Sequence, residues 1–133
     1  MPPTHFPLQS VQQLREAERN RHRRQLEAAR CGEAESQAAV EQIQDQLDQL
    51  AQTLRNAVHP GVLEIGELQL LKERQQTLRK QLDQSRQQRE DRRAESERRR
   101  LALTQADRQV RVLERLAERY QQRRAARNTA CLS

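Results

Sequence analysis

Residues that break helices are nearly absent from most of this sequence and gather in two places. Three of the four prolines lie within the first seven residues, and the fourth, Pro60, stands beside Gly61 with Gly66 close behind. Elsewhere only Gly32 disfavours a helix, and the chain is rich in Gln, Arg, Glu, Leu and Ala, which favour one. Two long helices joined by a turn are therefore predicted. The predicted order is a flexible segment 1–7, a helix 8–58, a turn 59–63, a helix 64–127 and a flexible tail 128–133.

Both predicted helices carry the alternating three- and four-residue spacing of a left-handed coiled coil. In the second helix the predicted seam positions are Leu68, Leu71, Gln75, Leu78, Leu82, Ser85, Arg89, Arg92, Ser96, Arg99, Leu103, Ala106, Val110, Leu113, Ala117 and Tyr120. In the first helix they are Leu26, Ala29, Glu33, Ser36, Val40, Ile43, Leu47, Leu50, Leu54 and Ala57. Leu8, Val11 and Leu14 follow a shifted phase, which predicts a one-residue phase change near residues 22–26. Together with Val110 and Leu113 of the second helix, these three residues are then expected to hold the two helix ends together.

When the chain is folded back about its turn, apolar stretches of one helix face apolar stretches of the other, and polar stretches face polar stretches. Ile43 then faces Leu82 and Leu47 faces Leu78, while the polar Glu33 falls opposite Arg92. Two unrelated helices would have no reason to match their apolar and polar stretches. The sequence therefore predicts an all-α fold, an elongated two-helix antiparallel coiled-coil hairpin, in preference to a parallel dimer.

Composition argues against a globular core and against catalysis. Apolar residues make up 34% of the chain and charged residues 33%, with Phe6 and Tyr120 as the only aromatic residues. The three histidines are far apart in sequence, and neither cysteine has a second ligand at metal-binding spacing. We expect no enzyme activity, no cofactor, no metal, no small-molecule substrate and inert, reduced thiols. The start of the chain lacks a secretion signal, so a cytoplasmic location is expected.

Charge is the feature that points to partners. The net charge is +6, and nearly all basic residues are arginine. Residues 86–100 are basic with interleaved acids, which is typical of a solvated coiled-coil face carrying ion pairs, although nucleic-acid binding or a plain scaffold role remains an alternative. Arginines also recur at helical spacing where the two chain ends meet, and an arginine-rich end suits an acidic-lined opening. The residues predicted to bind a partner there are Arg15, Arg19, Arg108, Arg111, Arg115 and Arg119.

Several stretches resemble the FliJ family of flagellar export proteins. They are Pro60-Gly61 with Leu68 and Leu71, the stretch 102–124 containing VLERLAER at residues 112–119, and the opening FPLQSVQQLREAERNRHRRQLEAA at residues 6–29. The resemblance extends over nearly the whole chain and includes its length. The stalk proteins of injectisomes, the YscO group, share the architecture and stay an alternative, but the opening and the VLERLAER block are closer to the flagellar family.

The resemblance implies a stalk of the flagellar type III export apparatus. In that role the end carrying both termini would enter a hexameric export ATPase of the FliI kind, and the rest would reach an export gate protein of the FlhA kind. Export chaperones are further partners implied by the resemblance, and the location would be the cytoplasmic face of the cell membrane. No motif here places the gate contact on particular residues. Nucleic acid is not expected as a partner, and the membrane is expected to be reached only through other proteins.

The hairpin hypothesis predicts the shape of the free protein. Because a helix rises 1.5 Å per residue, a monomeric hairpin should scatter X-rays at small angles as a rod about 90 Å long and two helices thick. A globular scattering profile, or a rod twice as long, would contradict this architecture.

Overall fold

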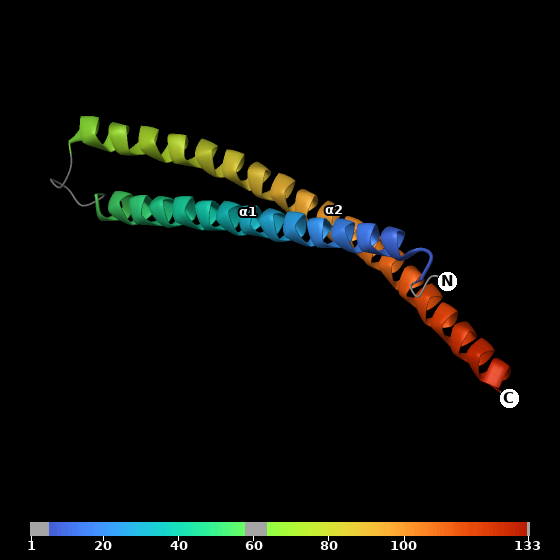
Figure 1. The fold of residues 1–133 in the computed structure, drawn as a ribbon. Coiled ribbons are helices and arrows are strands. Elements are labelled where there is room, and N and C mark those ends of the chain that lie inside the picture. The colour runs from blue at the N-terminus through green and yellow to red at the C-terminus, as the bar shows by residue number, and fades with distance from the viewer. Residues whose placement is uncertain (1–5, 58–63, 133) are drawn as a thin grey trace. The chain divides into compact units, whose positions relative to one another are not determined.

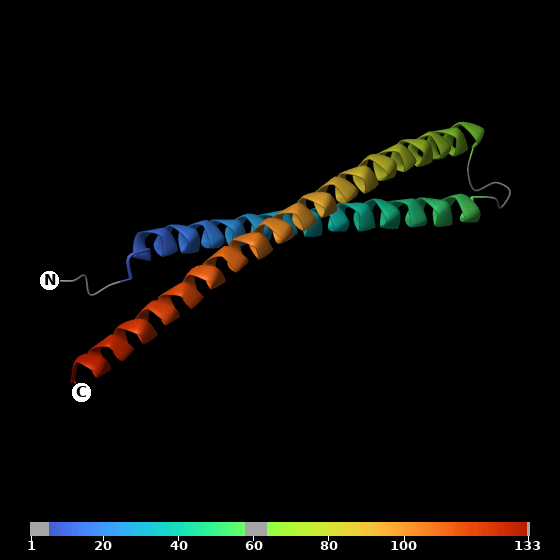
Figure 2. The ribbon, with the colours of Figure 1, turned by 90° about the vertical axis from the view of Figure 1, so that its right-hand side faces the viewer.

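A computed structural model describes residues 6–57 and 64–132, and it confirms the all-α two-helix hairpin. Helix α1 runs over Gln9–Asn56 and helix α2 over Ile65–Leu132, and Figures 1 and 2 show the two packed side by side. The predicted turn at residues 59–63 lies outside the described residues, as do residues 1–5 of the predicted N-terminal segment. No helix in the described part of the chain is long and apolar enough to cross a membrane.

The helix ends agree with the placement of helix breakers, with one exception. Helix α1 starts just after Pro7, where the Gln9 amide donates to the Phe6 carbonyl at 3.0 Å. Helix α2 continues to Leu132, five residues past the predicted end, into the stretch expected to be a flexible tail. That stretch contains neither Pro nor Gly, and the Thr129 hydroxyl donates to the Ala125 carbonyl at 2.8 Å. Nothing there ends a helix.

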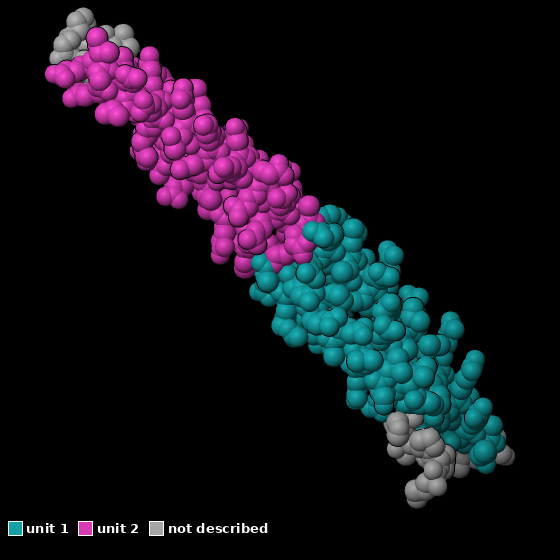
Figure 3. Space-filling view, turned by 90° about the horizontal axis from the view of Figure 1, so that it is seen from above, with its two compact units in different colours: residues 1–28, 97–133 teal, residues 29–96 magenta. Residues whose placement is uncertain are grey.

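Packing divides the chain into two compact units, each made from one stretch of both helices. They are coloured separately in Figure 3: unit 1 comprises residues 1–28 and 97–133, and unit 2 comprises residues 29–96. The division falls where the predicted seam is richest in polar residues. Each unit is described separately below.

Unit 2 contains the most regular apolar seam. Val40 and Leu78 are 1% and 2% exposed, and Leu82 is also buried. Leu50 and Leu78 line the same surface hollow, as expected if residues 47–50 face residues 75–78. The seam positions predicted from the heptad are buried or half-buried throughout this unit except Arg92. Heptad phase and register are therefore as the sequence predicted here.

The polar part of unit 2 packs through long side chains laid over small ones. Arg92 crosses above Gly32, where an added Cβ would meet its guanidinium at 3.0 Å. Arg93, and not the predicted Arg92, reaches Glu33 at 3.7 Å, because Arg92 is the residue that lies over the glycine. The buried Ser36 hydroxyl donates to the Gly32 carbonyl one turn earlier at 3.0 Å. Ser96 is buried as well, and its hydroxyl has no hydrogen-bond partner among the described residues.

The basic stretch 86–100 is a network of local and cross-helix pairs, as expected for a solvated coiled-coil face. In unit 2 Arg93 also contacts Glu90 at 3.4 Å. In unit 1 Arg100 holds Glu97 through hydrogen bonds of 2.6 to 3.2 Å. These hydrogen bonds, together with the positive charge of Arg100, lower the pKa of the Glu97 carboxyl although its side chain is exposed. Exposed pairs of this kind add little to stability.

The seam of unit 2 predicts a sharp difference between two leucines of α2. Leu78→Asp places a charge without a partner in the closed seam and should lower the free energy of unfolding by several kcal/mol, on the order of 3–5. Leu70→Asp makes the same chemical change at a side chain that is 66% exposed and should change it by less than about 0.5 kcal/mol. Urea melts followed by circular dichroism measure both. Similar losses for the two variants would contradict the seam described here.

Candidate functional site

Basic charge is concentrated in unit 1. Its stretches of sequence contain 15 arginines and 7 acidic residues, a net charge of +8, whereas unit 2 has 10 Lys and Arg against 12 acids, a net charge of −2. The two values account for the net +6 of the chain. All six arginines predicted to bind a partner belong to unit 1. The candidate site is therefore this unit, and its surface depends on which arginines are engaged inside it.

Two of the six predicted arginines lie in the seam between the helices. Arg15 donates from Nη1 to the carboxylate of Glu18 and to the side-chain oxygen of Gln109 on α2, both at 3.1 Å. The Arg19 side chain is 21% exposed, and its Nη1 lies 4.0 Å from the Asp107 carboxylate. Both residues therefore connect α1 to α2, and of the two Arg15 keeps the more exposed side chain, at 40%.

This arrangement corrects the predicted heptad phase. Leu8, Val11 and Leu14 were expected in the seam, but their side chains are 42%, 40% and 58% exposed. No phase change occurs near residues 22–26. The pattern that contains Leu26 continues backward through residues 22, 19, 15 and 12, which are all half-buried. The expectation that Leu8, Val11 and Leu14 help to hold the helix ends together is wrong, whereas Val110 and Leu113, which were expected to act with them, are buried and half-buried.

Arginine stems take the place of the missing apolar side chains. In this register Arg15 lies level with Val110, which is completely buried, and Arg19 lies level with Ala106, which is 7% exposed. An arginine can cover apolar surface with its three methylenes while the guanidinium stays at the rim. Toward the start of α1 the seam of unit 1 thus sets long polar residues of α1 level with short apolar residues of α2, whereas farther along α1 the apolar Leu26 is buried.

The two aromatic residues of the chain pack against each other at the end of the seam near the start of α1. The rings of Phe6 and Tyr120 lie 5.6 Å apart at an angle of 57°, a favourable tilted arrangement. Phe6 falls in the segment predicted to be flexible, yet it is packed against α2. This pair, and not the leucines, is the apolar contact nearest the start of α1.

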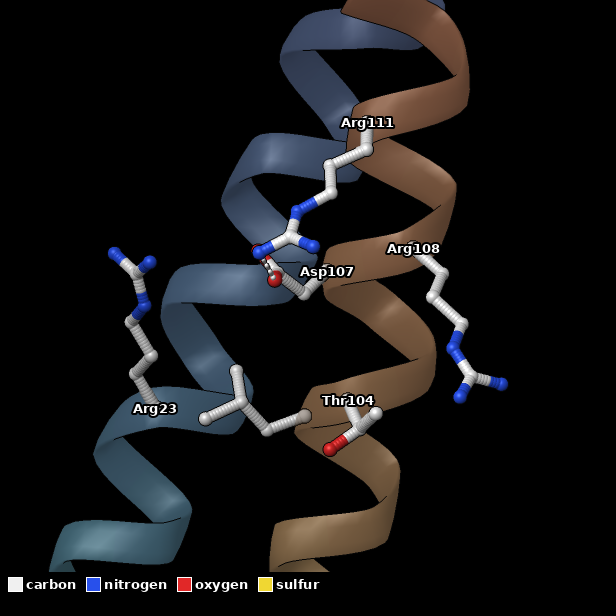
Figure 4. A pocket seen from close by; sticks show the side chains of 6 residues that line it. Arg23, Thr104, Asp107, Arg108 and Arg111 are labelled. Carbon is white, nitrogen blue, oxygen red and sulfur yellow. Dashed lines mark ion pairs between the residues drawn. The ribbon is translucent and has the colours of Figure 1, made fainter.

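Three arginines and one carboxylate line a shallow pocket on one side of unit 1. The arginine pocket is lined by Arg23, Leu103, Thr104, Asp107, Arg108 and Arg111 (Figure 4). Asp107 sits at its centre, paired with Arg111 at 3.1 Å and near Arg19 at 4.0 Å. Arg108 projects away from α1 in the same view, so it is directed to solvent. The arrangement can receive a carboxylate or another anion beside the one already present.

The remaining predicted arginines are free to meet a partner. Arg108, Arg115 and Arg119 are exposed, and none of them forms an ion pair within residues 6–57 and 64–132. Together with the arginine pocket they make the outer surface of α2 strongly basic. The sequence analysis did not select Arg23 and Asp107, although the spacing of four between Asp107 and Arg111 is a signal for their pairing.

Comparison with known proteins decides the family. The family model described as "Flagellar FliJ protein" matches residues 4–129. The chain belongs to the FliJ family. It is thus a component of the flagellar export apparatus, in a family whose role there is non-catalytic, and the resemblance noted from the sequence is confirmed. No curated protein and no solved structure gave a significant match to this sequence.

The seam of this FliJ-family chain predicts that Arg19 acts through its stem and not its charge. Arg19→Ala should lower the free energy of unfolding by about 1–2 kcal/mol, because it uncovers the surface around Ala106. Arg19→Met keeps most of the stem and removes a guanidinium Nε that is buried without a partner among the described residues, so it should match or exceed the wild type. Thermal and urea melts measure both. Equal losses would mean that the ion pair with Asp107 carries the stabilisation.

Proposed function

We propose that this chain is the stalk of the flagellar export apparatus and that unit 1 binds inside the ring of the hexameric export ATPase. In this proposal the exposed arginines of α2, Arg108, Arg115 and Arg119, contact acidic side chains of the ring. Arg111 contributes through the arginine pocket. Arg15 and Arg19 have a supporting role, because they hold the two helices together beneath the contact surface.

The unequal charge of the two units is the observation that carries the proposal. The net charge is +8 on unit 1 and −2 on unit 2, so one unit is strongly basic and the other is slightly acidic. An acidic-lined opening attracts the basic unit and gives the hairpin an orientation. Arginine suits this contact, because its planar guanidinium binds carboxylates in a fork while its stem covers apolar surface.

Other partners follow from the proposed role. An export gate protein would be reached by the part of the chain that stays outside the ring, and export chaperones could bind to the stalk during its cycle. The chain would then lie on the cytoplasmic side of the cell membrane and associate with it through these partners. No residues are assigned to the gate.

Charge reversal on the outer surface of α2 tests the ring contact. The variant Arg108→Glu/Arg115→Glu/Arg119→Glu should lose most of the stimulation of ATP hydrolysis by the purified export ATPase, because three attractive contacts become repulsive. Its circular dichroism should stay close to that of the wild type, since these side chains are exposed. Hydrolysis rates over a titration of each variant are the measurement.

A matched control lies on the same helix in unit 2. Arg74→Glu/Arg79→Glu/Arg86→Glu makes the same change in net charge at three exposed arginines and should keep full stimulation. Equal losses in both variants would show that overall charge, and not unit 1, governs the effect. Full stimulation by the unit 1 variant would overturn the proposed ring contact. Steeply salt-dependent binding of duplex DNA that is lost in the unit 1 variant would favour the nucleic-acid alternative.

A further inference from the structure

Unit 1 exposes apolar side chains that its own seam does not use. Val11 and Leu14 on α1 are 40% and 58% exposed, and Val112 and Leu116 on α2 are 56% and 39% exposed. We call these four residues the apolar face. Single exposed aliphatic residues need no explanation, but a cluster on a chain so poor in apolar residues does.

The hydrogen bonds of Arg15 place the four residues on the same side of unit 1. On α1, Val11, Leu14 and Glu18 share one side, because they are three and four residues apart. On α2, Gln109, Val112 and Leu116 do the same. Arg15 donates to both Glu18 and Gln109, so the two stripes flank the seam on the side to which Arg15 points. Together they form a short strip about two helical turns long, made of two aliphatic rows with the polar contacts of Arg15 between them.

The opposite side of unit 1 is chemically different. Asp107, Arg111, Glu114 and Glu118 recur on α2 at spacings of three and four, and Asp107 pairs there with Arg19 and Arg111. The acids of this part of α2 are therefore directed away from the apolar face. Its neighbours are instead basic: Arg108 precedes Val112 by four residues, and Arg119 follows Leu116 by three. Within residues 6–57 and 64–132 the one carboxylate beside the face is that of Glu18, which Arg15 already holds.

We infer that the apolar face is a docking site for an amphipathic helix of a partner protein, with acidic residues flanking that helix's apolar stripe. Two parallel rows of aliphatic side chains on adjacent helices accept a third helix through positions i, i+3, i+4 and i+7. The arginines at the edge would then pair with the acids beside the stripe. The inference concerns a different surface from the ATPase contact, although Arg108 and Arg119 border both.

Two other occupants fit the face less well. A second copy of the chain would bring a face with the same arginine edge against this one, which opposes like charges. A lipid surface is best met by a long apolar stripe with aromatic side chains. Here the strip is short and aliphatic, and Phe6 and Tyr120 are packed against each other.

Binding of two designed peptides to the full chain tests the inference. One is a helix of about 18 residues with leucines at i, i+3, i+4 and i+7 and glutamates beside them, and the other has lysines in place of the glutamates. Fluorescence anisotropy near physiological salt should show binding of the acidic peptide only. In the variant Leu14→Gln/Val112→Gln its Kd should rise at least about tenfold. The control Leu70→Gln, at an exposed leucine of unit 2, should leave the Kd within about twofold.

Each alternative has its own outcome in these experiments. If Leu14→Gln/Val112→Gln bound the acidic peptide with the same Kd as the wild type, charge alone would account for the binding and the inference would fail. It would also fail if the lysine peptide bound equally well.

Other measurements test the two other occupants. If the free chain sedimented as a dimer and the same variant as a monomer, the face would be assigned to a second copy. Flotation with anionic vesicles that depends on Leu14 and Val112 would assign it to a membrane. Because Leu14 and Val112 are not in the proposed ring contact, ATPase stimulation by this variant separates the two proposals.

Discussion

A hairpin of two helices can bury side chains only along the line where the helices meet. Within the described residues this seam buries just eight side chains, and every other position is partly or fully exposed. The phase of the heptad therefore decides two things at once, which residues stabilise the fold and which can meet a partner. A phase error of one residue exchanges these roles, because neighbouring residues on a helix point about 100° apart.

The part of unit 1 near the start of α1 shows why the phase could not be read from apolar residues alone. Sequence analysis used leucine and valine as markers of the seam, which succeeds in unit 2, where Val40, Leu78 and Leu82 are buried. In unit 1 the marker succeeds at Leu26 and Val110, which are buried, but it fails on α1 before Leu26, where half-buried positions of the seam are Gln12, Arg15, Arg19 and His22. A hydrophobic pattern counts arginine as a charged residue, yet its side chain includes three methylene groups that can cover apolar surface. Continuing the heptad strictly from Leu26 would have given the correct phase.

The helix boundaries and the register were easier to predict than the contacts. Proline and glycine place the helix ends within a few residues, except at the C-terminal end, where no breaker is present. Matching of apolar and polar stretches gave the register, which the pairs Arg15 with Gln109 and Arg93 with Glu33 confirm in the two units. The contact between Phe6 and Tyr120 carried no periodic signal, because Phe6 precedes the helix. A contact made by a residue outside the heptad repeat cannot be predicted by extending that repeat.

The choice of candidate site residues depends on which arginines already have partners inside unit 1. Of the six arginines selected from the sequence, Arg15 and Arg19 are used in the seam and Arg111 is held by Asp107. A guanidinium has five N–H groups, so Arg111, which pairs with Asp107 through Nη2 and is 68% exposed, can still contact a partner's carboxylate, whereas Arg19 is 21% exposed and is less accessible. The exposed Arg108, Arg115 and Arg119 have no such interaction to lose among the described residues. Their position on the outer side of α2, between the apolar face and Asp107's pocket, gives one short unit two adjoining surfaces of different chemistry, and each can be changed without disturbing the seam that supports both.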